Sequence, residues 1–149
     1  MAVPPTARTV TPKDAEWLLP RTPRSVGHSR VLLREQSRSW GIPDETTWTA
    51  VLLLSELMTN ACVHARVPPG RVIGTRCVLL ADRLRVEVSD ASRDLPRLKL
   101  ASRDDEAGRG LVLVASLADA WDVHPRAYGI GKTVWFELGV LLGKVSDAN

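Results

Sequence analysis

What the 149-residue sequence lacks excludes several classes of protein. It has only two cysteines, Cys62 and Cys77, with no CxxC pair and no Cys/His cluster. We therefore expect two buried thiols in a reducing compartment and no zinc site. No apolar run reaches the roughly 18 residues of a membrane span, and no charged segment leads into an apolar one at the start of the sequence. We expect a cytoplasmic protein that neither enters a membrane nor is exported.

A strong charge of one sign is also missing. The 20 basic residues are interspersed with 17 acidic ones, for a net charge of +3, so nothing predicts nucleic-acid binding. There is no Gly-x-Ser-x-Gly elbow, and none of the three histidines has an evident Ser or Cys partner, which argues against a hydrolytic triad. Gly131-Lys132-Thr133 resembles the end of a P-loop, but that motif requires glycine at the position of Arg126 and a following helix instead of a strand.

The length and the continuity of the pattern predict one domain. A chain of this size buries about 70% of its unfolded surface and needs no disulfide or metal to be stable. No repeat or linker divides it. We expect a loose N-terminal arm over residues 1–23, with a short edge strand as an alternative for part of it, a domain over residues 24–139, and a frayed tail over residues 140–149.

Two helices should open the domain. Ser25 is a good N-cap for a helix to about Trp40, and Gly41 would stop it. Asp44 would cap a central helix over residues 45–66.

The first of these helices has a basic outer face. Arg30, Arg34 and Arg38 recur every four residues and so share one side of the helix. We interpret the row as a solvated face, with a contact to an acidic protein partner as the alternative. Nucleic acid is less favoured still, because no aromatic residues interleave.

Strands should follow. The patterns predict an antiparallel pair over residues 71–80 and 84–89, a polar loop over 91–107, a helix from Leu111, and two last strands over 121–124 and 132–138. The order favours an α/β (α+β) two-layer sandwich, with a mostly antiparallel sheet covered by helices on one face.

Asp90 has an unusual position in this pattern. Leu84, Val86 and Val88 alternate with polar residues, and Asp90 shares their parity. A carboxylate pointing to the covered face without a partner would cost several kcal/mol. Either the chain turns away at Asp90, or the carboxylate has a partner, for which the amino group of a ligand would serve.

The central helix carries a polar stripe. Glu56, Asn60 and His64 are spaced four residues apart at the border of the apolar arc, where side chains are partly desolvated. Each alone is more simply explained as an inert marginal residue, but three aligned residues of ligand type indicate a candidate site. Gly108 and Gly110, placed before a helix, would expose backbone N–H groups to an anion, although Gly-x-Gly by itself only indicates a turn.

In this order, these segments resemble the GHKL ATPase superfamily, and most closely its small bacterial branch of anti-sigma factors that are serine kinases. The first box is similar to Ser55-Glu-Leu-Met-Thr-Asn-Ala-Cys-Val-His-Ala65 and the second to Val88-Ser-Asp-Ala-Ser-Arg-Asp-Leu-Pro96. The third is similar to Gly108-Arg-Gly-Leu-Val-Leu-Val114, and the closing strand to Gly131-Lys-Thr-Val-Trp-Phe-Glu-Leu138. The resemblance implies the Bergerat-type ATP-binding fold.

The resemblance also implies roles for single residues. Asn60 would bind the Mg²⁺ that bridges the ATP phosphates, Asp90 would accept a hydrogen bond from the adenine amino group, and Thr133 would support the same pocket through water. Glu56 would take the proton from an attacking serine hydroxyl or orient a water. His64 would pack, or support a ligand from behind. The remaining nucleotide-contacting positions would be Pro96, Gly108, Arg109, Gly110 and Leu111.

By the same resemblance the protein would hold a sigma factor and phosphorylate a serine of its antagonist, an anti-anti-sigma protein. Members of the branch often form dimers through the first helix and edge strand, which makes a homodimer an expected assembly. Two departures support an alternative, a nucleotide-gated binding module without catalysis. The second box lacks the glycines of the wider superfamily, and the lid between Pro96 and Gly108 is short. A stable α/β domain with an inert stripe is the third hypothesis.

Overall fold

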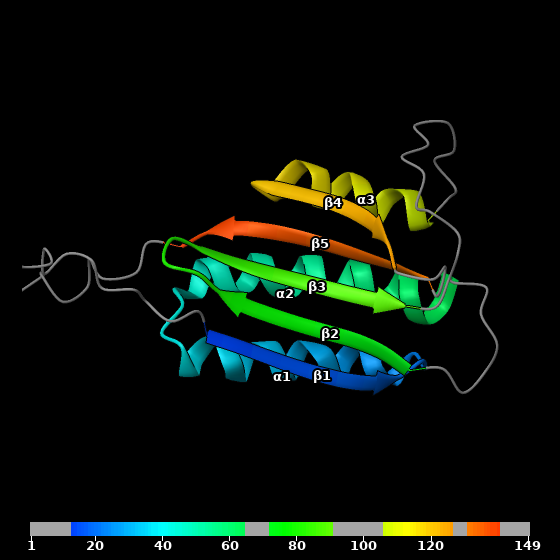
Figure 1. Ribbon diagram of the computed structural model, residues 1–149, viewed down its shortest axis with the longest axis horizontal. Helices are drawn as coiled ribbons and strands as arrows, with labels where there is room; N and C mark the ends of the chain where they lie inside the picture. Colours follow the sequence, from blue (N-terminus) through cyan, green and yellow to red (C-terminus); the bar gives the residue numbers. More distant parts are fainter. Residues whose placement is uncertain (1–12, 65–71, 91–105, 127–130, 141–149) are drawn as a thin grey trace, which may run out of the picture.

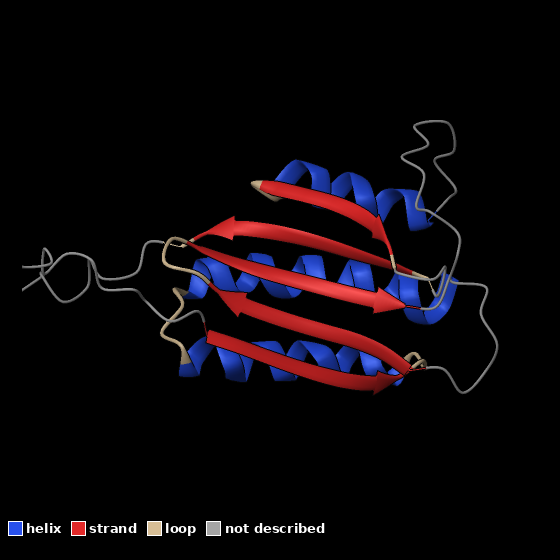
Figure 2. Cartoon of the chain, in the orientation of Figure 1, coloured by secondary structure: helices blue, strands red, loops and turns tan. Residues whose placement is uncertain are grey.

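The computed structural model describes residues 13–64, 72–90, 106–126 and 131–140; for residues 63, 64 and 106–110 it describes the backbone alone. Within these ranges a five-stranded sheet has three α-helices on one face (Figures 1 and 2). The strands are β1 (Lys13–Pro20), β2 (Val72–Leu79), β3 (Arg83–Asp90), β4 (Ala120–Pro125) and β5 (Lys132–Gly139). The helices are α1 (Arg24–Ser39), α2 (Asp44–Thr59) and α3 (Glu106–Leu117), and α2 continues into a π-helical turn, η1 (Asn60–His64).

The strands are arranged in the order β1-β2-β3-β5-β4, and all four pairings are antiparallel. This confirms the predicted two-layer sandwich and its antiparallel pairs. The edge strand considered for the N-terminal arm is present as β1, so residues 13–20 of that arm belong to the sheet. Trp17 and Leu19 explain the pairing, because these alternate residues pack on the core. At the other end Val140 is buried and its N–H donates to the carbonyl of Asp82, so the fold extends one residue into the predicted tail.

The two faces of the sheet differ as the alternation in β3 predicts. Leu84, Val86 and Val88 are buried beneath the helices. The opposite face carries ion pairs instead: the Arg83 and Arg85 guanidinium groups lie 3.2 Å and 3.8 Å from the Glu137 carboxylate. Arg85 also lies over the ring of Trp135, with its Cζ 3.9 Å from the ring centroid. Within the described ranges the helices therefore cover one side of the sheet, as predicted.

The ends of α1 correct one prediction and confirm another. Ser25 is not the N-cap, since the helix begins at Arg24 and the Ser25 hydroxyl donates to the carbonyl of Pro20 at 2.5 Å. Gly41 does end the helix: its φ is 71°, its N–H donates to Arg38, and the next N–H, that of Ile42, donates to Ser37. These two bonds form a Schellman motif. The turn sends α2 back along α1, against which it packs.

The central helix begins and ends differently from the prediction. Asp44 is the first helical residue and makes no cap hydrogen bond, because Pro43 occupies the position before it. Its carboxylate still lies at the positive end of the helix dipole. Regular α-helix ends at Thr59, and η1 replaces the predicted continuation. Residues 65–71, which include the predicted end of the helix, lie outside the described residues.

The third helix starts earlier than its glycines suggest. α3 begins at Glu106, so Glu106 and Ala107 are helical instead of the end of a loop. The rest of the predicted lid, residues 91–105, lies outside the described residues. The last two strands match their predicted positions to within two residues.

Candidate functional site

One end of the sheet brings together the ends of several elements. β3 and β4 end there, β5 begins there, and η1 and the start of α3 lie over them (Figure 1). η1 contacts α3, and α2 contacts both β3 and β5. Every predicted site residue that the structure describes belongs to this end or to the last turns of α2.

Asp90 stays in the strand and faces the helices. Its side chain is 5% exposed, and its Oδ2 lies 3.8 Å from Nζ of Lys132, whose side chain is 11% exposed. The two residues are direct cross-strand partners in the β3–β5 ladder. Arg126, just after β4, donates from Nη1 to the Asp90 carbonyl at 3.5 Å. Of the two outcomes considered for Asp90, the structure has the second: a buried carboxylate with a cationic partner.

Thr133 does not lie beside the Asp90 carboxylate. It pairs with Ser89, and the two hydroxyl oxygens lie 2.7 Å apart. Because side chains alternate along a strand, Thr133 lies on the open face of the sheet and Lys132 lies on the side of Asp90. The structure therefore does not bring Thr133 together with the Asp90 carboxylate. The parity that placed Asp90 also applied to β5, where Val134 and Phe136 are buried, and would have identified Lys132.

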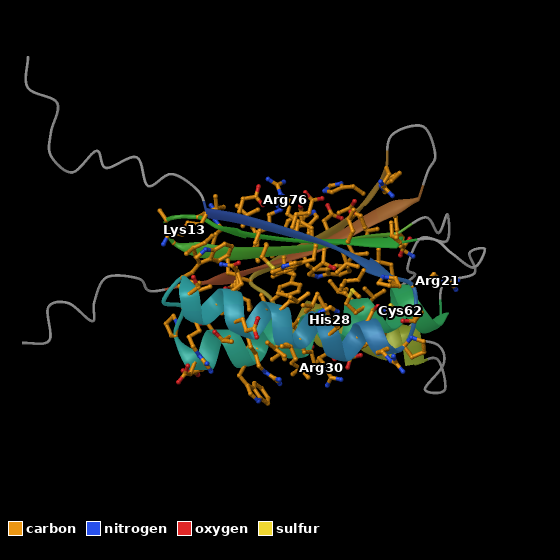
Figure 3. The ribbon with its side chains drawn as sticks, turned by 90° about the horizontal axis from the view of Figure 1, so that it is seen from below. Lys13, Arg21, His28, Arg30, Cys62 and Arg76 are labelled. Atoms are coloured by element: carbon orange, nitrogen blue, oxygen red, sulfur yellow. The ribbon has the colours of Figure 1, made fainter. Side chains whose placement is uncertain are left out.

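Arg21 was missed by the sequence analysis. It lies in the turn between β1 and α1, and its Nε donates to the carbonyl of Ala61 in η1 at 3.3 Å. Figure 3 shows Arg21 and Cys62 at the same end of the molecule. Burial raises the pKa of the Cys62 thiol, and the Asp90 carboxylate raises it further, while a backbone hydrogen bond at Thr22 and the charge of Arg21 oppose the shift. Asp90 and Arg21 thus both influence the pKa of the Cys62 thiol in η1, with opposite signs.

Glu56 and Asn60 are one helical turn apart and half-buried, as expected at the border of an apolar arc. The Asn60 N–H donates to the carbonyls of Glu56 and Leu57. Asn60 is also the first residue of the π-helical turn, in which hydrogen bonds span five residues instead of four. The regular spacing that aligned His64 with the other two therefore ends at Asn60. Single π turns are frequent at functional sites.

The glycine segment lies inside α3. In a helix that begins at Glu106 the first four N–H groups have no helical partner. The N–H of Gly108 belongs to this set, whereas Arg109 and Gly110 lie beyond it. The Leu111 side chain is buried. Pro96 lies outside the described residues.

A groove lies on the helical side, away from Asp90. It has a volume of about 330 Å³ and runs between α1 and α2, on the side of the helices where Figure 3 shows Arg30, while Arg76 lies on the opposite, open face of the sheet. Trp48, 69% exposed, lies at its edge. The basic row that we interpreted as a solvated face is exposed and lines this groove. Its lining is Arg30, Arg34, Arg38, Ile42, Asp44, Thr47, Trp48, Val51, Leu52 and Ser55.

Among the helices that the structure describes, none combines the length and apolar character needed to cross a membrane. None of the curated proteins compared with this chain matches it. The model of the histidine kinase-like ATPase domain family matches residues 19–138, which include Glu56, Asn60, Asp90 and the glycines of α3. That match spans most of the sequence and agrees with the antiparallel sheet covered by helices on one face. The chain therefore belongs to the histidine kinase-like ATPase domain family, whose members are expected to bind ATP.

Proposed function

We propose that this protein is an ATP-binding anti-sigma regulator with serine kinase activity toward an anti-anti-sigma antagonist. The observation that carries the proposal is that the buried carboxylate of Asp90, at the end of β3, lies at the same end of the molecule as the turn that begins at Asn60, one helical turn after Glu56 (Figure 1). By resemblance to the family, Asp90 would be the base-binding group, Asn60 the metal-binding group and Glu56 the catalytic group. In the proposed cycle the protein releases a sigma factor when it binds the antagonist.

The described residues fit ATP and Mg²⁺ in their chemistry. Asp90 offers acceptor oxygens to an amino group of the base, and the Asn60 carboxamide oxygen is a hard ligand suited to Mg²⁺. The first N–H groups of α3, with the positive end of its dipole, suit phosphate oxygens. ATP supplies the phosphoryl group when it is bound. The protein contributes mainly positioning and charge neutralisation to such a transfer.

Glu56 acts as the general base in this proposal. Its side chain is half-buried, so it can be partly desolvated and still reach a serine hydroxyl presented by the antagonist. It accepts the hydroxyl proton as the serine oxygen attacks. A positioned base of this kind contributes about 10²- to 10⁴-fold to the rate. A homodimer through α1 and the edge strand β1 is part of the proposal, because an edge strand has unpaired backbone groups along one side.

The test is phosphate transfer from labelled ATP to candidate antagonists in the presence of Mg²⁺. We expect Glu56→Gln to lose about 10²-fold or more of the transfer rate while it keeps ATP affinity. Asn60→Ala should lose the Mg²⁺ dependence of ATP binding measured by calorimetry. Glu45→Gln is the matched control, because Glu45 is an exposed carboxylate in the first turn of the same helix. Unchanged transfer in both Glu56→Gln and Asn60→Ala would refute the mechanism.

The groove between α1 and α2 favours a second candidate, a nucleotide-gated binding module without catalysis. Its arginine row and the exposed Trp48 suit an acidic partner segment better than they suit a chemical step. This candidate predicts ATP binding with no transfer to any antagonist, and a partner affinity that changes with nucleotide. Arg34→Glu should then weaken partner binding and leave ATP affinity intact. If wild-type protein binds no nucleotide, both candidates are wrong.

A further inference from the structure

Asp90 and Lys132 form a buried pair across β3 and β5. Lys132 lies directly across from Asp90 on the neighbouring strand, and its Nζ lies 3.8 Å from the Asp90 Oδ2. That distance lets the charges attract but is too long for a direct hydrogen bond. Both side chains are nearly buried, so desolvation opposes keeping two charges here. The end of the sheet thus presents an acceptor and a charged donor side by side.

We propose that Lys132 is a specificity-determining residue for the nucleotide base, and that this pocket accepts guanine as well as adenine nucleotides. This inference rests on the proposed binding of a nucleotide base at Asp90. A carboxylate accepts hydrogen bonds only, and an ammonium group donates only. The pair therefore matches any base edge on which a donor and an acceptor are neighbours.

Both purines have such an edge. In adenine the 6-amino donor is flanked by ring-nitrogen acceptors. In guanine the 6-carbonyl acceptor is next to the N1–H donor, and the 2-amino donor follows on the same edge. A carboxylate alone would leave the guanine carbonyl buried without a donor, which is costly. Lys132 supplies that donor, with a charge that strengthens the bond to a carbonyl oxygen.

A purely structural role for the pair makes a different prediction. A cross-strand ion pair that only ties β3 to β5 would affect stability, and its loss would weaken binding of all nucleotides alike. A lysine that hydrogen-bonds to the nucleotide base affects the ratio of GTP affinity to ATP affinity. The ratio is therefore the readout that separates the two roles.

The experiment is calorimetric titration of the full chain with ATP and with GTP. For the wild type we expect dissociation constants for ATP and GTP within about tenfold of each other. Lys132→Met should weaken GTP binding at least about tenfold more than ATP binding, as the loss of a charge-assisted hydrogen bond to a buried carbonyl implies. Lys132→Arg keeps a charged donor and should retain GTP binding. Lys13→Met, at an exposed position of β1, is the control and should change neither affinity.

Removal of Lys132 leaves the Asp90 charge without this cation and can unfold the domain. The wild-type protein provides a second measurement that avoids this problem. GTP should bind about tenfold more tightly than 6-thio-GTP, whose sulfur is a weaker acceptor at the same position.

The role of Lys132 would be refuted if GTP and 6-thio-GTP bound with equal affinity. It would also be refuted if the wild type bound ATP more than about 100-fold more tightly than GTP. Neither result would contradict ATP binding. An equal loss of both nucleotides in a folded Lys132→Met protein would refute that role as well. No binding of either nucleotide by the wild type would instead refute the proposed function, and the base-reading role with it.

Discussion

Two glycines of the α1 region should respond with opposite signs to the same substitution. Gly41 has a φ of 71° in the turn that connects α1 to α2. A Cβ built at Gly41 would meet no atom within 4 Å, so Gly41→Ala introduces no clash and its whole cost is the left-handed backbone. That cost is about 1–2 kcal/mol for a residue with a Cβ.

Gly27 is the position with which Gly41 is compared, because the same substitution to alanine should have the opposite effect there. It lies in the first half of α1, and a Cβ there would meet only the tip of Arg30, at an ordinary contact distance of 4.0 Å. Alanine in place of a helical glycine restricts the unfolded chain without straining the folded one, which stabilises by about 0.5–1 kcal/mol. The two variants should therefore differ in free energy of unfolding by roughly 1.5–3 kcal/mol.

Urea denaturation followed by far-UV circular dichroism measures both changes against the wild type. We expect a lower midpoint for Gly41→Ala, a higher midpoint for Gly27→Ala, and an unchanged slope for both. In thermal melts each kcal/mol should correspond to about 2–4 °C for a chain of this size. If Gly41→Ala were neutral or stabilising, the left-handed turn between the helices would be wrong, and with it the placement of α2 relative to α1.

Three further predictions concern the core, the open face and the thiols. Leu54 is fully buried in α2, so Leu54→Ala should lower the free energy of unfolding by about 2–5 kcal/mol in the same denaturation assay. A hydrogen bond from Arg76 lowers the pKa of Asp14, so this pair stabilises the fold above the carboxyl's unfolded pKa and the contribution is lost as pH falls through its folded pKa. In Asp14→Asn the free energy of unfolding should therefore fall slightly less steeply as the pH is lowered. The difference should be small and should disappear at high salt, because both side chains are nearly half exposed. Burial raises the pKa of Cys77 to about 12 and also raises that of Cys62, so iodoacetamide at pH 8 should label both far more slowly in the native protein than in urea, as counted by mass spectrometry. Rapid labelling of the native protein would contradict their burial.

The sheet and its covered face followed from local pattern. Alternation in β3 identified Leu84, Val86 and Val88 as core residues because a strand repeats every two residues, and the same parity raised the question of Asp90. The apolar arc of the central helix followed equally well from its helical period, and Gly41 marked the end of α1. These features depend on neighbours a few positions apart, which a sequence displays directly.

Other boundaries depended on contacts between distant segments. Ser25 matched the preferred chemistry of an N-cap, but its hydroxyl bonds to Pro20 at the end of β1, and the helix begins one residue earlier. β1 itself has little strand signal apart from Trp17 and Leu19, and its pairing with β2 decides its structure. Propensity is a weak prior wherever tertiary packing can override it.

By itself the sequence determined the core strands, the antiparallel sheet covered on one face and the order of motifs that indicates a histidine kinase-like ATPase domain. Only the tertiary structure decided the register between β3 and β5, which places Lys132 directly across the ladder from Asp90. It also decided that the helix changes to a π turn at Asn60 and that Arg21 binds this turn. The physical reason is that register and hydrogen bonding between segments distant in the chain set these positions, and a shift of one residue along a strand moves a side chain to the other face.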